Sequence, residues 1–223
     1  MKLTHLHRLI EAQAHRKALR DLMNRLRFGA GAPLSDETIW IRPRDVTHVF
    51  QRTRAHDYRR RHSGLVLGGD WDRQRRPLEG TVKYDACVAH FAQGVPWDET
   101  GIYDEMLRRI AEGKPADGCK TRDDIVARYA RMDALFDHLR RTGRFERMRD
   151  LPDHLRREHG GVFVHIDRDG LPLLAGNGNH RMAMARVLDL PVIPAHLGVI
   201  HRQALESGQL AGLRKPPEDR AAR

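Results

Sequence analysis

The stretch that most constrains the fold lies near the end of the chain, from Gly161 to His201. It opens with alternating side chains from Val162 to Asp167, which is the period of a β-strand. Asp169-Gly170 then predicts a two-residue hairpin turn before a second strand at Leu171 to Leu174. This part of the chain therefore requires a sheet.

The next segment, GNGNHR, leads from the hairpin into a helix, because Met182, Ala185 and Leu188 recur at helical spacing. The start of a helix offers unpaired backbone N–H groups and a partial positive charge, and glycines let an anion approach closely. The candidate phosphate ligands are therefore Gly176, Asn177, Gly178, Asn179, His180 and Arg181. The alternative is a tight turn that uses Gly and Asn for left-handed backbone conformations.

This segment resembles the signature of the ParB/sulfiredoxin superfamily, in which a loop of the form Asp-Gly-x-His-Arg opens a helix and a Val-Pro-Val strand follows. The matching residues are 177–181, Ala183, Ala185 and 192–194, within a similarity that covers about 40 residues. The resemblance implies an α+β fold with a mixed sheet and flanking helices, here with an N-terminal helical extension. It also implies that the loop holds nucleotide phosphates.

Three departures limit what the resemblance implies. Sulfiredoxins carry a catalytic cysteine where this chain has Asn179, so reduction of cysteine sulfinic acid is not expected. The free-serine kinase branch, the closest in design, usually begins the loop with Asp, whereas this chain has Asn177. Only about 20 residues follow His201, too few for the helix-turn-helix domain of chromosome-partition ParB proteins.

A second candidate constellation is the segment GGDWD, which follows the apolar run 65–67. The run is typical of a buried strand that ends in a loop. Asp70 and Asp72 are two residues apart, and in extended backbone their side chains point the same way. The two carboxylates would then share one Mg²⁺ ion, or divide into a metal ligand and a general base. The alternative is an Asp-capped turn with Trp71 in the core.

Composition narrows the classes of function. The chain has 223 residues and a net charge of +10, with 40 basic and 30 acidic residues spread along it. Such a surface suits nucleic acid or a phosphorylated substrate, and Arg59 to Arg61 is the densest basic run, although a solvated face is the simpler interpretation. Cys87 and Cys119 form no metal-binding or redox motif. No membrane span or signal peptide is evident, which favours a cytoplasmic protein.

Helical periodicity predicts the remaining organisation. An amphipathic helix is expected from Leu3 to Phe28, packed on the domain or on another copy of the chain, which would make a homodimer. Further helices are expected from Tyr103 to Glu112 and from Thr121 to Arg141. The expected units are an N-terminal helix (1–31), a ParB/sulfiredoxin-like domain (32–203) with a helical insertion (about 103–150), and a flexible tail (204–223).

Two smaller groups are candidates for ligand contacts. Trp97 with Asp98 and Glu99 would either belong to the core or wall a pocket for a base or sugar. Arg122, Arg128 and Arg131 lie on the expected helix after Thr121. They would contact an anionic substrate only if this helix borders the glycine-rich loop.

Together these features predict an ATP- and Mg²⁺-dependent phosphotransferase acting on a small hydroxyl-bearing molecule. ATP phosphates would lie on 176–181, with Mg²⁺ on Asp70 or Asp72 and the other carboxylate activating the acceptor. His180 and Arg181 would stabilise charge on the transferring phosphoryl group. The alternative is a ParB-like module without redox activity that binds nucleic acid, or cleaves it as a nuclease, through its basic surface.

Overall fold

The computed structural model describes residues 14–145 and 161–215, and a mixed β-sheet lies at its centre. Its strands follow the order β1-β7-β5-β6-β2-β4, and β3 pairs separately with β7. Their bounds are β1 Thr38–Ile41, β2 His48–Phe50, β3 Val66–Leu67, β4 Arg75–Pro77, β5 Val162–Ile166, β6 Pro172–Leu174 and β7 Ile193–His201. Strand β5, the first strand of the hairpin, runs antiparallel to its hairpin partner β6 and parallel to its other neighbour, β7.

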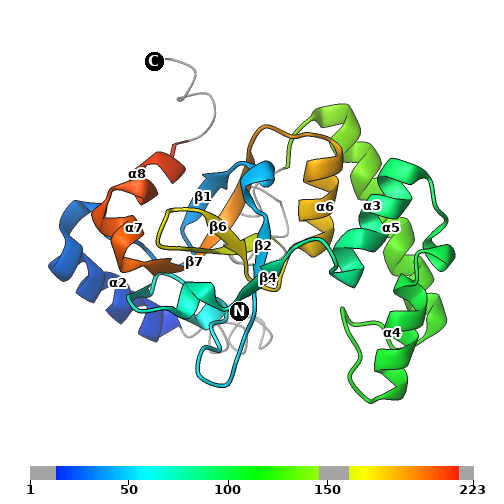
Figure 1. The fold of residues 1–223 in the computed structure, drawn as a ribbon, viewed down its shortest axis with the longest axis horizontal. Helices are drawn as coiled ribbons and strands as arrows, with labels where there is room; N and C mark the ends of the chain where they lie inside the picture. Colours follow the sequence, from blue (N-terminus) through cyan, green and yellow to red (C-terminus); the bar gives the residue numbers. More distant parts are fainter. Residues whose placement is uncertain (1–13, 146–160, 216–223) are drawn as a thin grey trace, which may run out of the picture.

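Helices flank the sheet in two groups, as Figure 1 shows: α2, α7 and α8 lie at one end, and α3 to α6 lie at the other. Their bounds are α2 Ala14–Phe28, α3 Val82–Gln93, α4 Ile102–Ala111, α5 Arg122–Thr142, α6 Asn179–Val187, α7 Arg202–Glu206 and α8 Gln209–Leu213. The fold is therefore mixed α/β with a mixed sheet and flanking helices, which agrees with the α+β class predicted from the sequence.

Strand β5 is buried along its whole length. Its aliphatic residues Val162, Val164 and Ile166 pack in the main core, whereas His165 packs against Phe50 and Trp71 in a smaller cluster on the opposite face. Because both faces of β5 are covered, the alternation of side chains in the sequence does not separate a solvent-exposed face from a buried face.

The hairpin between β5 and β6 forms as predicted, but its turn is longer than two residues. Ile166 pairs with Pro172, and the buried Asp167 carboxylate accepts backbone N–H groups from Asp169 (3.0 Å) and Leu171 (2.8 Å). These hydrogen bonds pair two backbone N–H groups of the turn, in which Gly170 has a left-handed conformation (φ 81°). An Asx-type side chain therefore sets the turn length, which the Asp-Gly pair alone does not indicate.

The predicted helices after the first 100 residues are confirmed as α4 and α5. Helix α5 begins with a capping box in which Thr121 Oγ1 accepts the Asp124 amide at 3.1 Å and the Asp124 carboxylate accepts the Thr121 amide at 3.0 Å. Helix α3 was not predicted. It ends at Gly94, whose left-handed conformation (φ 74°) closes the last turn.

The described residues agree with the expectation at the start of the chain and differ from it near the end. Helix α2 ends at Phe28 as predicted, while residues 3–13 of the predicted helix lie outside the described residues. Residues 204–213, expected to be a flexible tail, instead belong to α7 and α8, which anchor Ala204 and Leu210 in the core. Residues 216–223 of that tail lie outside the described part of the chain.

Candidate functional site

A cavity of about 520 Å³ opens at the glycine-rich loop, where the sheet meets the helices α3 and α5. The loop supplies Gly176 to Arg181, and the other walls come from segments far apart in the sequence. These are Arg60, Lys83, Asp117, Arg128, Met132, Leu135 and Gly161. The six residues predicted as phosphate ligands thus line one pocket, together with the predicted candidate Arg128 and with Lys83 and Asp117, which no local pattern in the sequence indicated.

The loop geometry depends on Gly178, the residue that precedes α6. Its φ is +94°, and a Cβ atom there would lie 2.8 Å from the Cα atom of Val162 on β5. Only glycine fits this close approach without displacing backbone. No side chain caps the helix start at Gly178, so the first turn of α6 is presented to the pocket with its positive end of the helix dipole.

Arg181, in that first turn, is a partly buried cation. Its guanidinium lies 5.4 Å from the centroid of the Phe145 ring, and burial lowers its pKa. Within residues 14–145 and 161–215 it forms no ion pair with a carboxylate. A desolvated cation of this kind at a pocket wall favours an anion as its partner.

Arg60 reaches the same loop from the short helix η3, Arg60–His62. The hydrogen-bonding groups around Asn177 require its side-chain amide oxygen to face Arg60. In that orientation Asn177 Oδ1 accepts a hydrogen bond from Arg60 Nε at 3.0 Å. Arg60 also lies over the ring of Phe163, with 5.7 Å between guanidinium carbon and centroid. The basic run Arg59 to Arg61 is therefore divided, because only its middle member lines the pocket.

A second group of charges in the pocket lining consists of Lys83, Asp117 and Arg128. Lys83 donates a hydrogen bond to Asp117, and Arg128 Nη2 lies 3.5 Å from the same carboxylate oxygen. Burial opposes ionisation of Asp117, but the Lys83 hydrogen bond and the Arg128 charge outweigh it, and the pKa of this carboxyl is lowered. Asp117 also holds an uncommon left-handed backbone conformation (φ 57°). The pocket lining therefore contains one carboxylate and four cationic side chains, which are Arg60, Lys83, Arg128 and Arg181.

His180 lines the pocket, but most of its surface is buried. Its imidazole is 8 % exposed, and Nε2 lies 3.1 Å from the hydroxyl of the buried Tyr129. Burial, with the nearby charges of Lys83 and Arg128, lowers the pKa of His180 to about 4. The ring is therefore neutral at neutral pH and adds no positive charge to the pocket.

The two carboxylates of GGDWD come together, but around Arg168 and outside the pocket. The Arg168 side chain donates to Asp72 Oδ2 (2.8 Å) and Oδ1 (2.7 Å) and to Asp70 Oδ1 (2.7 Å). The segment is also not an extended strand at this point, because Trp71 to Arg73 form a short 3-10 helix with Trp71 in the core. The pair ties this helix to the β5–β6 hairpin.

This arrangement does not fit a Mg²⁺ site. Both carboxylate oxygens of Asp72 and Oδ1 of Asp70 already accept hydrogen bonds from Arg168. Across residues 14–145 and 161–215, no group of three or more histidine, cysteine, aspartate or glutamate side chains is placed to hold a metal ion.

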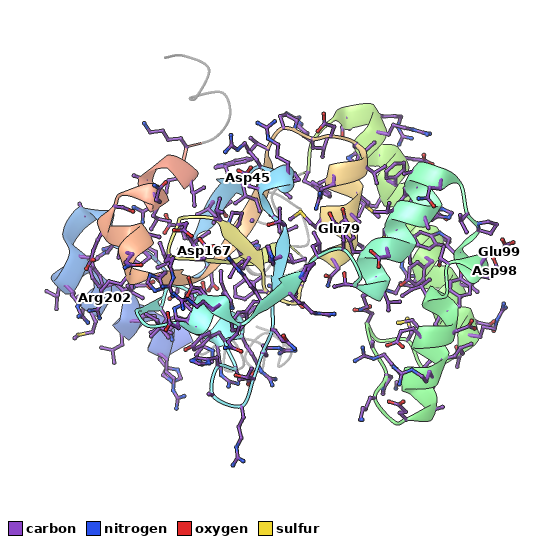
Figure 2. All side chains as sticks on the ribbon, in the orientation of Figure 1. Asp45, Glu79, Asp98, Glu99, Asp167 and Arg202 are labelled. Carbon is purple, nitrogen blue, oxygen red and sulfur yellow. The ribbon has the colours of Figure 1, made fainter. Side chains whose placement is uncertain are left out.

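The other candidates from the sequence divide between core and pocket. Trp97 packs in the core, where it donates to Asp133 at 2.8 Å, and it does not line the loop pocket. Figure 2 shows Asp98 and Glu99 at the outer edge of the helical group, far from the sheet and from Asp167. Of the three arginines predicted on α5, only Arg128 lines the pocket.

Comparison with known protein families, with curated proteins and with solved structures gave no match for this chain. The resemblance to the ParB/sulfiredoxin superfamily therefore remains a prediction from the sequence. In the described part of the chain, no helix combines the length and the apolar character that crossing a membrane requires.

Proposed function

We propose that the loop pocket binds the phosphate groups of a nucleotide, as in a nucleotide-binding domain of the ParB/sulfiredoxin type. The observation that carries this proposal is the charge of the pocket, whose lining contains four cations and the start of α6 but a single carboxylate. A di- or triphosphate complements such a site, because its oxygens accept both guanidinium and backbone N–H hydrogen bonds. The volume of about 520 Å³ is in the range of small-ligand sites.

Met132 and Leu135 give the pocket an apolar border on α5. A base or a ribose ring placed there would bury apolar surface while the phosphates remain at the loop. This border supports a nucleotide over inorganic phosphate as the ligand.

The narrower function, ATP-dependent transfer of a phosphoryl group to a small hydroxyl-bearing molecule, has less support from the geometry. Asp70 and Asp72 do not line the pocket, so neither is placed to activate an acceptor hydroxyl there. Asp117 is the one carboxylate among the lining residues, and it forms ion pairs with Lys83 and Arg128. Among the described residues, Asp117 is the carboxylate that a transferase acting in this pocket would use as its base, with Lys83 and Arg181 stabilising charge on the phosphoryl group.

The test is a calorimetric titration of the full chain with ATP, with CTP and with the corresponding nucleosides. The triphosphates should bind and the nucleosides should not, because the phosphates supply the main contacts. Arg181→Ala should weaken triphosphate binding by about tenfold or more, since a charge-assisted hydrogen bond is lost. The matched control is Arg141→Ala, an exposed arginine on α5 that does not line the pocket. Equal binding of nucleoside and triphosphate, or equal losses in the two variants, would refute the proposal.

A second candidate function, nucleic-acid binding, rests on a different surface. Three exposed arginines, Arg52, Arg59 and Arg61, surround one carboxylate, Asp57, at distances of 3.9, 2.8 and 3.9 Å. One carboxylate cannot neutralise three cations, so this surface retains the positive charge that a phosphate backbone requires.

The two candidates respond to different variants. If duplex DNA binds this surface, an Arg59→Ala/Arg61→Ala double variant should reduce the salt dependence of its retention, and Arg181→Ala should leave it unchanged. Retention that is insensitive to salt, or equally affected by Arg181→Ala, would rule out this surface as the binding site.

A further inference from the structure

Helix α2 is attached to the protein by its polar side. Lys17, 5 % exposed, donates to both carboxylate oxygens of Asp36 at 2.8 and 2.7 Å. About two turns along the helix, Asn24 donates to the carbonyl oxygens of Pro33 (2.9 Å) and Gly64 (2.8 Å). Between them, Arg20 and Asp21 also bond to the backbone of neighbouring segments. These contacts fix the rotation of the helix about its own axis.

The apolar side of α2 consequently faces solvent. Leu19 is 62 % exposed, Leu22 54 %, Met23 56 % and Leu26 74 %. In the described residues only three other large hydrophobic side chains are comparably exposed, Val82 on α3, Val126 on α5 and Leu171 in the β5–β6 turn. The four side chains on α2 thus form the one concentrated apolar stripe among these exposed residues, which marks an interaction surface.

The spacing of the stripe indicates what kind of surface would cover it. Leu19, Leu22 and Leu26 are three and four residues apart, the seam of a two-helix contact. Lys17 and Asn24, seven residues apart on the opposite side, occupy the positions that face away from such a seam. A narrow seam of this kind fits a single helix better than a flat lipid surface, which favours a wider apolar face with aromatic residues.

The charges beside the stripe decide between a second copy and a different partner. Arg16 and Arg25 are exposed on its two borders and form no ion pair within the described part of the chain. The only acidic residue of α2 between Ala14 and Phe28 is Asp21, whose carboxylate accepts the Ser35 amide on the inner side. Two copies of α2 would therefore bring arginines together, whereas a helix with acidic borders would complement them.

We propose that the outer face of α2, formed by Leu19, Leu22, Met23 and Leu26, is a docking surface for an amphipathic helix of a partner protein whose apolar stripe is bordered by acidic residues. Leucines or similar side chains of the partner fill the seam, and its carboxylates pair with Arg16 and Arg25. This surface is separate from the loop pocket, since none of these residues lines it.

The probe is a synthetic helical peptide with leucines at three- and four-residue spacing and glutamates at the flanking positions. A second peptide keeps the leucines and replaces the glutamates with lysines. Fluorescence anisotropy with the full chain should show saturable binding of the glutamate peptide and much weaker binding of the lysine peptide. Leu22→Glu and Leu26→Glu should each weaken binding of the glutamate peptide by about tenfold or more. Leu171→Glu, an exposed leucine outside the helix, is the matched control.

A charge exchange gives a second readout that loss of folding cannot imitate. The double variant Arg16→Glu/Arg25→Glu should reverse the preference, so that the lysine peptide binds more tightly than the glutamate peptide. Equal binding of the two peptides, or no effect of Leu22→Glu, would overturn the proposal. A dimer of the chain that Leu22→Glu dissociates would instead assign the face to a second copy. Leu22-dependent sedimentation with phosphatidylserine vesicles would assign it to lipid.

Discussion

The Asp72 carboxylate accepts three hydrogen bonds from one residue, Arg168, whose backbone N, Nε and Nη2 lie 3.2, 2.8 and 2.7 Å away. The two residues are 96 positions apart in the sequence, and the Asp72 side chain is only 3 % exposed. The pair therefore joins the GGDWD segment to the β5–β6 hairpin and is a structural link between distant parts of the chain.

Asp72→Asn should lower the free energy of unfolding by about 2 kcal/mol, because it leaves the Arg168 charge without its enclosed partner. Asp70→Asn is the matched control and should leave stability unchanged within error, since the Asp70 side chain is 67 % exposed. Urea unfolding at neutral pH measures both. If Asp72→Asn abolished nucleotide binding without changing stability, the residue would have a functional role instead.

Acid should remove the same contribution in the wild-type protein. Although burial opposes it, hydrogen bonding to Arg168 lowers the pKa of Asp72 from 3.8 to about 2. Because the folded-state pKa lies below the unfolded one, the stabilisation is complete above the unfolded value and is lost as the pH falls toward about 2. Asp72→Asn should lack this part of the acid transition in urea titrations at decreasing pH.

Local patterns in the sequence predict those features that local physics determines. The strand, glycine-rich loop and helix from Val162 to Val187 follow from side-chain period and backbone freedom, and Thr121 marks the start of α5. No local pattern indicates the pocket cation Lys83, and Arg128 was a candidate only on the condition that its helix borders the loop, because both positions depend on how α3 and α5 pack. No local pattern in the sequence indicates that Arg168 is the partner of Asp72 either.

Helix α2 shows a second kind of limit. Its apolar period was evident, and periodicity identifies which residues share a face. It does not identify which face is buried. Here the hydrogen bonds of Lys17 and Asn24 determine the orientation, and the leucines remain outside.

Gly178→Ala should disrupt the loop more than Gly176→Ala. Both glycines have positive φ angles, +94° and +86°, so alanine at either position carries about 1–2 kcal/mol of backbone strain. Only at Gly178 would the new Cβ atom meet the backbone of Val162, at 2.8 Å, and that clash should add about 1–3 kcal/mol. Thermal unfolding of the two variants measures the difference. Equal losses of stability would show that the loop relaxes away from β5 without penalty.

The buried histidines should make the protein sensitive to mild acid. Burial lowers the pKa of His165 to about 3 and, with Lys83 and Arg128 nearby, the pKa of His180 to about 4. Since both folded-state values lie below the unfolded value of 6.5, the unfolded chain binds protons first. Stability should therefore be full above the unfolded value and decline below it, by at most about 2.7 kcal/mol per pH unit for two sites.

His180→Gln tests the share of that slope that belongs to His180. Glutamine does not titrate, so the variant should show a shallower loss of stability between about pH 6 and about pH 4, whatever its stability at neutral pH. Urea unfolding across this range supplies the slope. A slope identical to that of the wild-type protein would mean that His180 is protonated normally in the folded state.

The orientation of α2 predicts an inverted order of mutational effects. Asn24→Ala removes two buried hydrogen bonds and leaves the carbonyls of Pro33 and Gly64 without this donor, which should lower the free energy of unfolding by about 2 kcal/mol. Leu26→Ala, at a side chain that is 74 % exposed, should change it by less than about 0.5 kcal/mol. Urea unfolding of dilute protein compares the two. A helix packed through its leucines would give the reverse order, with the leucine variant the less stable of the pair.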